Sequence, residues 1–586
     1  MSSYGRTGNG SSTSAPRARP AASELKKKQK EQFTMPMERR RHNILLLLLD
    51  DLRDATHLHK MASFHAISQR GVTFTNAHAA GTSCGPSRAA LLTGRWPSLK
   101  SVCTNKQART LTAERQRHMT LPGLLKFHGY HVAGAGKVFH QSSCSFGTMG
   151  DDTWDEYFHS LPELRPDGAR AQYVCSGASE RDEVTTGEAP MPEPKLRFCE
   201  CANHGRLDLA AMLHPLPRPF AGLVWNGSVA VPDARIIAWA ISFLRSRATP
   251  WAADEQRPFF LAVGLHGAHA PYVVEDRAVA EAAATLFADG RSPLNMTGAE
   301  VELAGLPREG RAIAAGRDLA SRSPDDDLSA YEQQRRDWRS SANRRRIEQS
   351  MIGYAARLAE TDRRIGAILD ALGDSSGYIA RSTVVLLTAD HGVHLGEKAV
   401  AVGSKWTLWE PTSHVPLLLL APGAPAGRTV HTAVSLVDVL PTLAEAAAIT
   451  ISKTEALPGR SLLALLDDDA ASAARHRSVL VTHCPARTLL GYAVRDARFR
   501  YISYASRTNS SPAGRAWTSL DEAAAAGNEL YDTLTDPHEQ LNLLQAQREW
   551  NETERGGVRR RWSGMERALQ RLLAQQRLLP SGMRTV

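Results

Sequence analysis

Short, continuous apolar runs constrain the fold of this chain most strongly. Four of them contain four to six residues each, and polar or turn-forming residues bound each one. Runs of this length are typical of strands buried on both faces of a sheet, whereas an amphipathic helix shows apolar residues at every third or fourth position. We therefore predict buried strands at Ile44–Leu49, Phe259–Val263, Val384–Leu387 and Val415–Leu420.

A helical pattern separates the second run from the third. Between residues 347 and 372 the apolar side chains recur at helical spacing, at Met351, Tyr354, Leu358, Ile365, Ile368 and Leu369. Strands that alternate with helices form a layered α/β domain. We expect a large, doubly wound mixed sheet flanked by helices.

The pattern changes after Pro458-Gly459-Arg460 and a short predicted helix that ends near Leu466. Segments 478–483, 490–495 and 498–504 have the composition of short strands, and 527–544 predicts a closing turn and strand. A smaller C-terminal domain with an antiparallel sheet fits these segments. The predicted organisation is a disordered basic tail at 1–41, a main domain at 42–466 with an insertion or long loop at 291–346, a small α+β subdomain at 467–545, and an Arg-rich helical or disordered tail at 546–586.

The net charge of +10 comes from the two ends of the chain. Residues 1–42 contain ten lysines and arginines against three acidic residues, and residues 546–586 contain nine arginines against four glutamates. The sequence between them is nearly neutral, so we expect no nucleic-acid partner. The basic ends are interpreted as solvated tails, with membrane or nucleic-acid binding as the alternative.

Seven cysteines, at positions 84, 103, 144, 175, 199, 201 and 484, leave one unpaired in a fully oxidised chain. The spacing of Cys199 and Cys201 lacks the partner pair of a zinc site. A disulfide from Cys175 to either of them requires an oxidising compartment. Residues 1–42 contain no apolar signal segment and no run is long enough to span a bilayer, which favours a cytoplasmic chain. Glycosylation triplets keep a secretory location open, at Asn226, Asn295, Asn509 and Asn551.

Acidic residues directly follow two of the predicted strands. Asp50 and Asp51 follow the first run, and Asp390 and His391 follow the third. Because ligands collect at the carboxyl ends of strands in open α/β sheets, these side chains should meet at one edge. Three aspartates favour a hard cation, calcium or magnesium, with His391 as a ligand or beside the ligands.

A lone cysteine among small residues is usually a small buried apolar side chain. Cys84, however, lies in the run Thr82-Ser83-Cys84-Gly85-Pro86-Ser87-Arg88, which continues to Thr93-Gly94-Arg95. This run resembles the signature of the sulfatase family, Cys-x-Pro-Ser-Arg followed by a short helix that ends in Thr-Gly-Arg.

Further blocks resemble the branch of that family that contains iduronate-2-sulfatase. In chain order they are Asp50–Arg53, Gly136–His140, Pro258–His266, Asp390–Glu397, and Glu529–Asp532 followed by Asp536-Pro537. They extend over nearly all of the predicted folded chain. The resemblance implies an alkaline-phosphatase-like fold and a hydrolase that converts an O-sulfate ester to an alcohol and inorganic sulfate.

The resemblance also implies a nucleophile and a cofactor. Cys84 is oxidised after synthesis to formylglycine by a maturation enzyme. One hydroxyl of the hydrated aldehyde attacks the sulfate ester, and the second later expels the sulfate. A plain serine or cysteine has no second hydroxyl that could release the sulfate in this way. One calcium ion per chain is held by an oxygen of this residue together with Asp50, Asp51, Asp390 and His391.

The remaining matching residues handle charge and protons by the same resemblance. Arg88 lies one helical turn beyond Cys84 and stabilises the hydrate oxygens, while Lys137 and Lys405 neutralise the sulfate. His140 assists the elimination of sulfate. His266 protonates the leaving alcohol or holds the sulfate.

Two of these assignments have an alternative in the sequence. The segment after Glu397 has an apparent two-residue insertion relative to the family, so Lys398 is the alternative to Lys405. Near the second predicted strand the chain contains His266-Gly267-Ala268-His269, so His269 is the alternative to His266.

Two other functions remain open. A phosphonate or phosphate ester hydrolase of the same superfamily would share the fold and the metal edge. A non-catalytic relative would bind sulfated glycans without hydrolysing them, although the intact Cys-Gly-Pro-Ser-Arg set favours an enzyme. The resemblance points to a sulfated saccharide as substrate, and to a secretory or lysosomal-type location as the alternative to the cytoplasm.

Overall fold

The computed structural model describes residues 41–53, 61–98, 102–108, 120–140, 153–158, 213–214, 222–225, 232–247, 257–269, 272–275, 281–282, 284–285, 341–373, 377–399, 403–451, 457–466, 477–483, 489–506, 519–547 and 550–575. Residues 1–40 of the predicted tail 1–41, residues 291–340 of the predicted insertion 291–346, and the cysteines at 144, 175, 199, 201 and 484 lie outside these ranges. No helix within the described ranges is long and apolar enough to cross a membrane.

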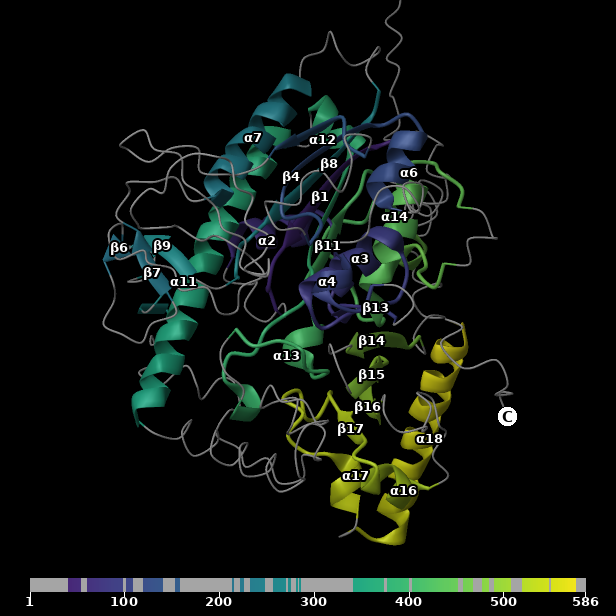
Figure 1. The fold of residues 1–586 in the computed structure, drawn as a ribbon. Coiled ribbons are helices and arrows are strands. Elements are labelled where there is room, and N and C mark those ends of the chain that lie inside the picture. Colours follow the sequence, from purple (N-terminus) through teal and green to yellow (C-terminus); the bar gives the residue numbers. More distant parts are fainter. Residues whose placement is uncertain are drawn as a thin grey trace, which may run out of the picture. The chain divides into compact units, whose positions relative to one another are not determined.

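A large mixed sheet forms the centre of the main domain (Figure 1). Its strands follow the order β12 (Arg428–Val430), β2 (Val72–Phe74), β11 (Leu417–Leu420), β10 (Thr383–Ala389), β1 (Asn43–Leu49), β8 (Phe259–Leu265), β4 (His131–Gly136) and β5 (Glu156–Phe158). The five strands from β10 to β5 are parallel, and β11 runs antiparallel to both of its neighbours. The predicted mixed sheet is therefore confirmed.

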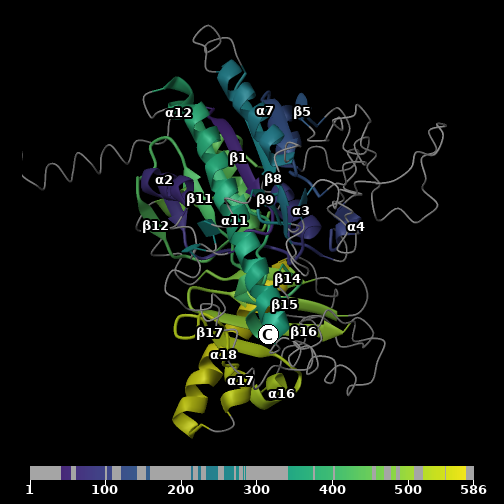
Figure 2. The same cartoon turned by 90° about the vertical axis from the view of Figure 1, so that its left-hand side faces the viewer.

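The central strands are apolar along their whole length because helices cover both faces of the sheet. Every residue from Ile44 to Leu49 in β1 is fully buried. α2 (Ala62–Arg70), α7 (Pro232–Arg247) and α11 (Ser341–Leu372) cover one face, and Figure 2 shows α11 running along it in front of the strands. α3 (Cys84–Thr93), α6 (Leu121–Phe127) and α14 (Val439–Ala446) cover the other face (Figure 1).

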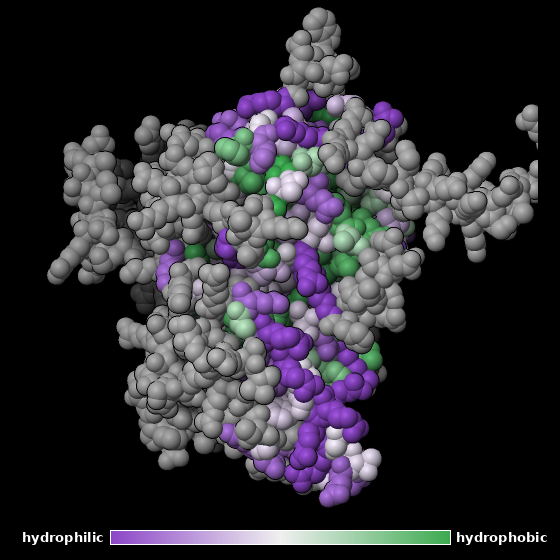
Figure 3. All heavy atoms as spheres, turned by 90° about the vertical axis from the view of Figure 1, so that its right-hand side faces the viewer, coloured by the Kyte–Doolittle hydropathy of each residue, from purple (hydrophilic) through white to green (hydrophobic). Residues whose placement is uncertain are grey.

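A second, antiparallel sheet follows in the C-terminal part of the chain. It consists of β14 (Val479–His483), β15 (Leu489–Arg495), β16 (Phe499–Ser506) and β17 (Glu529–Asp532). Helix α18 (Glu552–Gln575) packs on this sheet through Val558, Trp562, Met565 and Leu569. Its exposed positions include the arginines Arg559, Arg560, Arg561, Arg567 and Arg571. Figure 3 shows hydrophilic residues gathered on the lower part of the face that it draws.

Smaller elements complete the described fold. The short strands are β3 (Ala77–His78) paired with β13 (Val434–Ser435), and β6 (Leu213–His214), β7 (Gly222–Trp225) and β9 (Tyr272–Glu275) in a separate sheet. The short helices are α4 (Asn105–Ala108), α12 (Tyr378–Ser382), η5 (Glu397–Ala399), α13 (Glu410–Ser413), η6 (Leu436–Asp438), η8 (Leu462–Leu466), α16 (Leu520–Ala525) and α17 (Leu543–Ala546).

Two segments differ from the sequence prediction. Helix α11 begins at Ser341, inside the predicted insertion 291–346, because the helical pattern continues through polar residues that no apolar periodicity marks. The segment 527–544 contains not only the predicted closing strand, β17, but also the start of α17, which Asn542 caps through its side chain.

Candidate active site

Four neighbouring parallel strands end at one edge of the large sheet, and polar residues follow each of them. β4, β8, β1 and β10 are adjacent in that order. The side chains that follow them are Lys137 and His140, His266 and His269, Asp50 and Asp51, and Asp390 and His391. Ligands bind outside the carboxyl ends of strands in such sheets, so this edge is the candidate site.

Asp50, Asp51 and Asp390 form the acidic part of this edge. They offer carboxylate oxygens within 4.8 Å of one another, and all three residues are buried. The backbone of Asp51 has a φ of 60°, a left-handed conformation that residues with a side chain rarely adopt. Two hydrogen bonds hold it there, from the Asp51 N–H to Asp390 Oδ1 (3.2 Å) and from the Tyr354 hydroxyl to the Asp51 carbonyl (3.1 Å). Strain that the surroundings maintain in this way is typical of functional sites.

Arg88 and Lys137 neutralise these carboxylates. The Arg88 guanidinium donates from Nε to Asp390 Oδ2 (2.8 Å) and from Nη2 to Asp50 Oδ1 (3.2 Å). The Lys137 ammonium donates to Asp50 Oδ2 (2.6 Å). The Arg88 side chain is fully buried, so its planar fork sets the spacing of the two carboxylates.

Two glycines allow Lys137 to reach this position. Gly136, at the end of β4, has a φ of 73°, and Gly264 lies beside it in β8. A Cβ atom on Gly136 would stand 2.1 Å from the Gly264 carbonyl oxygen, and one on Gly264 would stand 2.0 Å from the Lys137 carbonyl oxygen. Glycine is therefore required at both positions for the close backbone approach that follows β4.

Cys84 is the first residue of α3 and is a buried, free thiol. Its Sγ lies 3.3 Å from His391 Nε2 and 3.3 Å from Lys405 Nζ. Burial raises the pKa of the Cys84 thiol, but the ammonium groups of Lys405 and Lys137 outweigh this effect and hold the pKa well below its usual value. The position therefore favours an anionic group.

The two candidate lysines lie in different surroundings. Lys405 Nζ donates to Asp51 Oδ1 (2.9 Å) as well as lying beside Cys84. Lys398 Nζ donates to the Glu539 carbonyl oxygen, and it lies 4.9 Å from the centre of the Trp409 ring and 5.1 Å from that of Tyr531. The structure thus brings Lys405 to the site and directs Lys398 into the contact with the C-terminal sheet.

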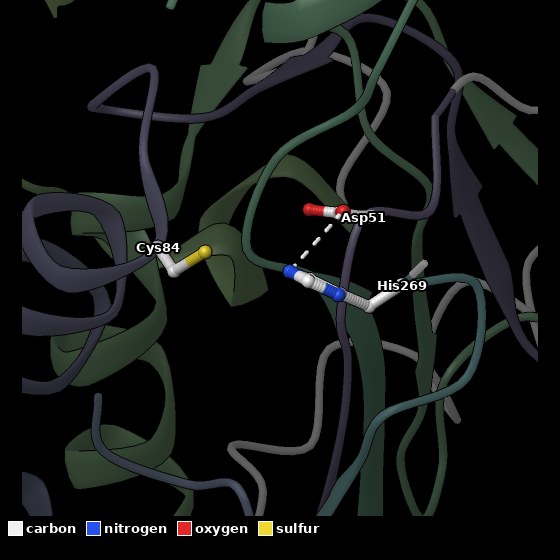
Figure 4. A group of neighbouring side chains, drawn as sticks. All are labelled: Asp51, Cys84 and His269. Atoms are coloured by element: carbon white, nitrogen blue, oxygen red, sulfur yellow. Dashed lines mark ion pairs between the residues drawn. The ribbon is translucent and has the colours of Figure 1, made fainter. Parts of the chain in front are cut away.

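The two candidate histidines are also distinguished. His269 Nε2 lies 3.7 Å from Asp51 Oδ2, and a ring nitrogen of His269, a carboxylate oxygen of Asp51 and Cys84 Sγ lie within 4.8 Å of one another. Figure 4 shows these three side chains around a common space. His266 Nδ1 is instead paired with Asp233 Oδ1 at 3.1 Å. Of these two candidates, His269, the second choice from sequence, is therefore the one that lies near the Cys84 thiol, in addition to His391.

His140 is buried, and neither of its ring nitrogens has a hydrogen-bond partner within the described part of the chain. Buried polar atoms are normally satisfied by protein or water. A buried imidazole with two unsatisfied nitrogens at a strand-end site fits a group that serves a bound ligand.

The donor set at this edge fits a hard divalent cation. Oxygen atoms of three carboxylates converge, and His391 lies next to Asp390 and Cys84 in a second set of converging donors. Burial raises the pKa of the Asp390 carboxyl, although Arg88 and His391 act in the opposite direction. A cation would favour the charged carboxylates, and calcium or magnesium matches a donor set dominated by carboxylate oxygens.

The sequence motifs did not include three residues that support the site. Tyr354 braces Asp51, Asp233 holds the turn that carries His269, and Arg357 pairs with Asp233. Pro232-Asp233 ahead of an apolar helical pattern is a helix-start signal that could have drawn attention to Asp233. Nothing in the sequence links that helix to a turn more than thirty residues later.

Known sequences match most of this chain. The family model described as Sulfatase matches residues 42–449. A sulfatase of Formosa agariphila is 25% identical over 530 residues, which cover 85% of this chain and 82% of that protein. Arylsulfatase K of Xenopus laevis is 25% identical over 81% of this chain and 73% of its own length. Iduronate 2-sulfatase of Homo sapiens is 27% identical over 66% of this chain and 60% of its own length.

Solved structures match the fold over nearly the whole chain. A protein in complex with its substrate D-glucosamine-2-N,6-O-disulfate aligns with a TM-score of 0.57 and 18% identity, over 92% of this chain and 98% of the other. Phosphonate monoester hydrolase of Agrobacterium radiobacter aligns with a TM-score of 0.55 and 18% identity, over 92% and 96%. At these identities the likeness establishes the fold, which is alkaline-phosphatase-like as the resemblance implied.

Proposed function

This chain belongs to the sulfatase family and is a sulfuric ester hydrolase, and from that premise we propose that it acts through Cys84 converted to formylglycine and through one bound calcium ion. The observation that supports this most is the position of Cys84. A thiol at the start of α3 lies 3.3 Å from an imidazole and 3.3 Å from an ammonium group, at an edge with three carboxylates. A structural cysteine needs no such set.

The metal would be held by Asp50, Asp51, Asp390 and His391, with an oxygen of the converted side chain in the place of Cys84 Sγ. When bound, calcium supplies positive charge to the sulfate oxygens and to the nucleophile. The hydrated aldehyde supplies two hydroxyl groups on one carbon, one as nucleophile and one to release the sulfate. Arg88 is paired with both Asp50 and Asp390 and favours their charged forms, so it would act on the ligand carboxylates and through them on the nucleophile.

The chain's own cations and imidazoles would carry out the remaining work. Lys405 and Lys137 bind the sulfate oxygens as they carry charge in the transition state. His269 donates a proton to the leaving alcohol, since it lies near Cys84 and Asp51 and, unlike His391, is not one of the proposed metal ligands. His140, whose ring nitrogens lack partners within the described residues, takes a proton during release of the sulfate.

The proposed substrate is a sulfated saccharide. Relatives that match this chain include an iduronate 2-sulfatase, and one protein with this fold has D-glucosamine-2-N,6-O-disulfate as its substrate. The proposal also needs a maturation enzyme that converts Cys84 in the compartment where the chain folds, the cytoplasm or, as the alternative by family resemblance, a secretory or lysosomal-type compartment.

The test compares parent and Cys84→Ala protein from a host that has a formylglycine-generating enzyme. The parent should hydrolyse aryl sulfates and members of a sulfated-saccharide panel faster than aryl phosphates and phosphonates, and a calcium chelator should suppress this activity. Cys84→Ala should reduce the rate to background, because no other group supplies the nucleophile. Faster hydrolysis of phosphonate esters would favour the rival hydrolase, and undiminished activity of Cys84→Ala would contradict the mechanism.

A further inference from the structure

Asp233 lies outside all of the sequence motifs, yet its carboxylate holds the start of the turn from His266 to His269. It is the second residue of α7 and is fully buried. Its Oδ1 accepts the backbone N–H of His266 (3.0 Å) and pairs with His266 Nδ1 (3.1 Å), and its Oδ2 accepts the backbone N–H of Gly267 (3.1 Å). One carboxylate thus receives three donors from two consecutive residues.

The same turn delivers His269 to the site. The His269 N–H donates to the His266 carbonyl (2.8 Å), which closes the turn, and Gly267 has a φ of 35° within it. His269 Nε2 then lies 3.7 Å from Asp51 Oδ2. Because only two residues separate the anchored end of the turn from His269, a shift at the anchor moves the imidazole.

Asp233 is itself held from the other side by α11. Arg357 Nη2 donates to Asp233 Oδ2 (2.5 Å), and Arg357 Nη1 donates to Glu360 Oε2 (2.9 Å). Burial raises the pKa of the Asp233 carboxyl, but Arg357 and the His266 hydrogen bond outweigh this and hold the pKa well below its usual range. The anchor is therefore a carboxylate and accepts hydrogen bonds on both oxygens, which a neutral amide cannot do.

We propose that Asp233, held by Arg357, is a positioning residue that fixes the His266–His269 turn and so places His269 beside Cys84 and the ester oxygen. This inference rests on the proposed function, in which His269 protonates the leaving alcohol. Asp233 touches no reacting atom in this account. It acts through the geometry of the turn.

The decisive variant is Asp233→Asn, which keeps the side-chain volume but replaces one of the two accepting carboxylate oxygens with an NH2 group that can only donate. With an alkyl or sugar sulfate, whose leaving oxygen needs a proton, kcat/KM should fall about 100-fold, since a misplacement of about 1 Å has this effect. With nitrophenyl sulfate, whose leaving group needs little protonation, the loss should be about threefold or less. A steeper dependence on leaving-group basicity is the signature of a misplaced proton donor.

Asp362→Asn is the matched control. Asp362 is also buried and also accepts backbone N–H groups, those of Ser63 (3.0 Å) and Phe64 (3.2 Å) at the start of α2. Its substitution should lower the melting temperature but leave the leaving-group dependence of the parent unchanged. If kcat/KM of Asp233→Asn fell by the same factor on all esters, so that its leaving-group dependence equalled that of Asp362→Asn, the proposal would be overturned. If Asp233→Asn does not fold, Arg357→Lys, which keeps the charge but loses the fork, should give a smaller loss with the same leaving-group pattern.

Amide hydrogen exchange tests the positioning without turnover. In Asp233→Asn the amides of His266 and Gly267 should exchange about 10- to 100-fold faster than in the parent, because each loses a hydrogen bond to a charged acceptor. The same amides should be unaffected in Asp362→Asn. Unchanged exchange in Asp233→Asn would refute the anchor, whereas a parent with protected amides and no activity on any sulfate ester would refute only the proposed function.

Discussion

The side chains around Cys84 occur as close pairs of opposite charge. Lys405 pairs with Asp51, and Lys137 and Arg88 pair with Asp50. Burial lowers the pKa of Lys405, but Asp51 and Cys84 more than compensate, and the pKa is raised above its usual value. Lys405 therefore stays charged, which a residue that binds a sulfate oxygen requires.

Replacing each of the two neighbouring lysines should separate catalysis from stability. Lys405→Ala should lower kcat/KM on an aryl sulfate by about 100- to 1000-fold, as expected when one preorganised charge at the reacting group is lost. Lys398→Met should lower the melting temperature, because it removes the buried ammonium group that contacts two aromatic rings and a carbonyl oxygen. The kcat/KM of the folded variant should stay within about twofold of that of the parent. Steady-state kinetics and thermal melts on both variants measure this. A folded Lys398→Met protein as inactive as Lys405→Ala would contradict the assignment.

Strand β14 supports the segment that leads into α3. The Thr482 N–H donates to the Ala80 carbonyl (2.9 Å), and His483 Nδ1 lies 2.8 Å from Thr82 Oγ1, two residues before Cys84. The C-terminal sheet therefore contributes to the position of the nucleophile. Burial alone lowers the pKa of His483 to about 4.

The burial of His483 should make the free energy of unfolding depend on pH between the pKa values of this residue in the folded and unfolded chain. The unfolded chain protonates His483 near pH 6.5, but the folded chain does so only near pH 4, so the unfolded state binds more protons between these values. Stability should fall as the pH falls through this window, by up to about 3 kcal/mol from this residue. In His483→Gln, denaturant unfolding at pH 7 and pH 4.5 should show a smaller difference than in the parent. An identical difference in both proteins would show that His483 is not the cause.

The central strands were predictable from the sequence because a strand buried on both faces is a continuous apolar run, as at Ile44–Leu49. The position of the site was predictable because parallel strands end at the same edge of the sheet. Loops were not. The sequence left Lys398 open as the alternative to Lys405, and only the fold shows that Lys398 lies against the rings of Trp409 and Tyr531. Asp233 was missed because two of its partners are backbone N–H groups, which leave no trace in residue type, and its side-chain partners His266 and Arg357 lie far away in the sequence.

A buried polar network joins the C-terminal sheet to the start of α13, the short helix ahead of β11 of the large sheet. The Trp409 indole N–H donates to Glu529 Oε2 (2.8 Å). Arg500 in β16 is fully buried, with Nη2 2.5 Å from Glu410 Oε1 and Nε 2.6 Å from Glu539 Oε1. If the two sheets separated, the buried arginine and glutamate side chains would lose their partners of opposite charge. The large sheet and the C-terminal sheet should therefore unfold together.

Arg500→Met tests this coupling. It removes the cation between two buried carboxylates and should lower the free energy of unfolding by about 3–5 kcal/mol. Scanning calorimetry should show a single transition in both proteins, shifted to lower temperature in the variant. Two separate transitions in the parent, with only one of them shifted, would contradict a jointly stabilised molecule.

The central claim concerns the chemical form of residue 84 in active protein. Co-expression with graded amounts of a formylglycine-generating enzyme should give preparations that differ only in the fraction of Cys84 converted to the aldehyde. Peptide mass spectrometry measures that fraction, and hydrolysis of an aryl sulfate measures activity on the same samples. The account predicts that specific activity rises in proportion to the converted fraction and extrapolates to background at zero conversion. Full activity in a preparation whose Cys84 is entirely thiol would contradict it.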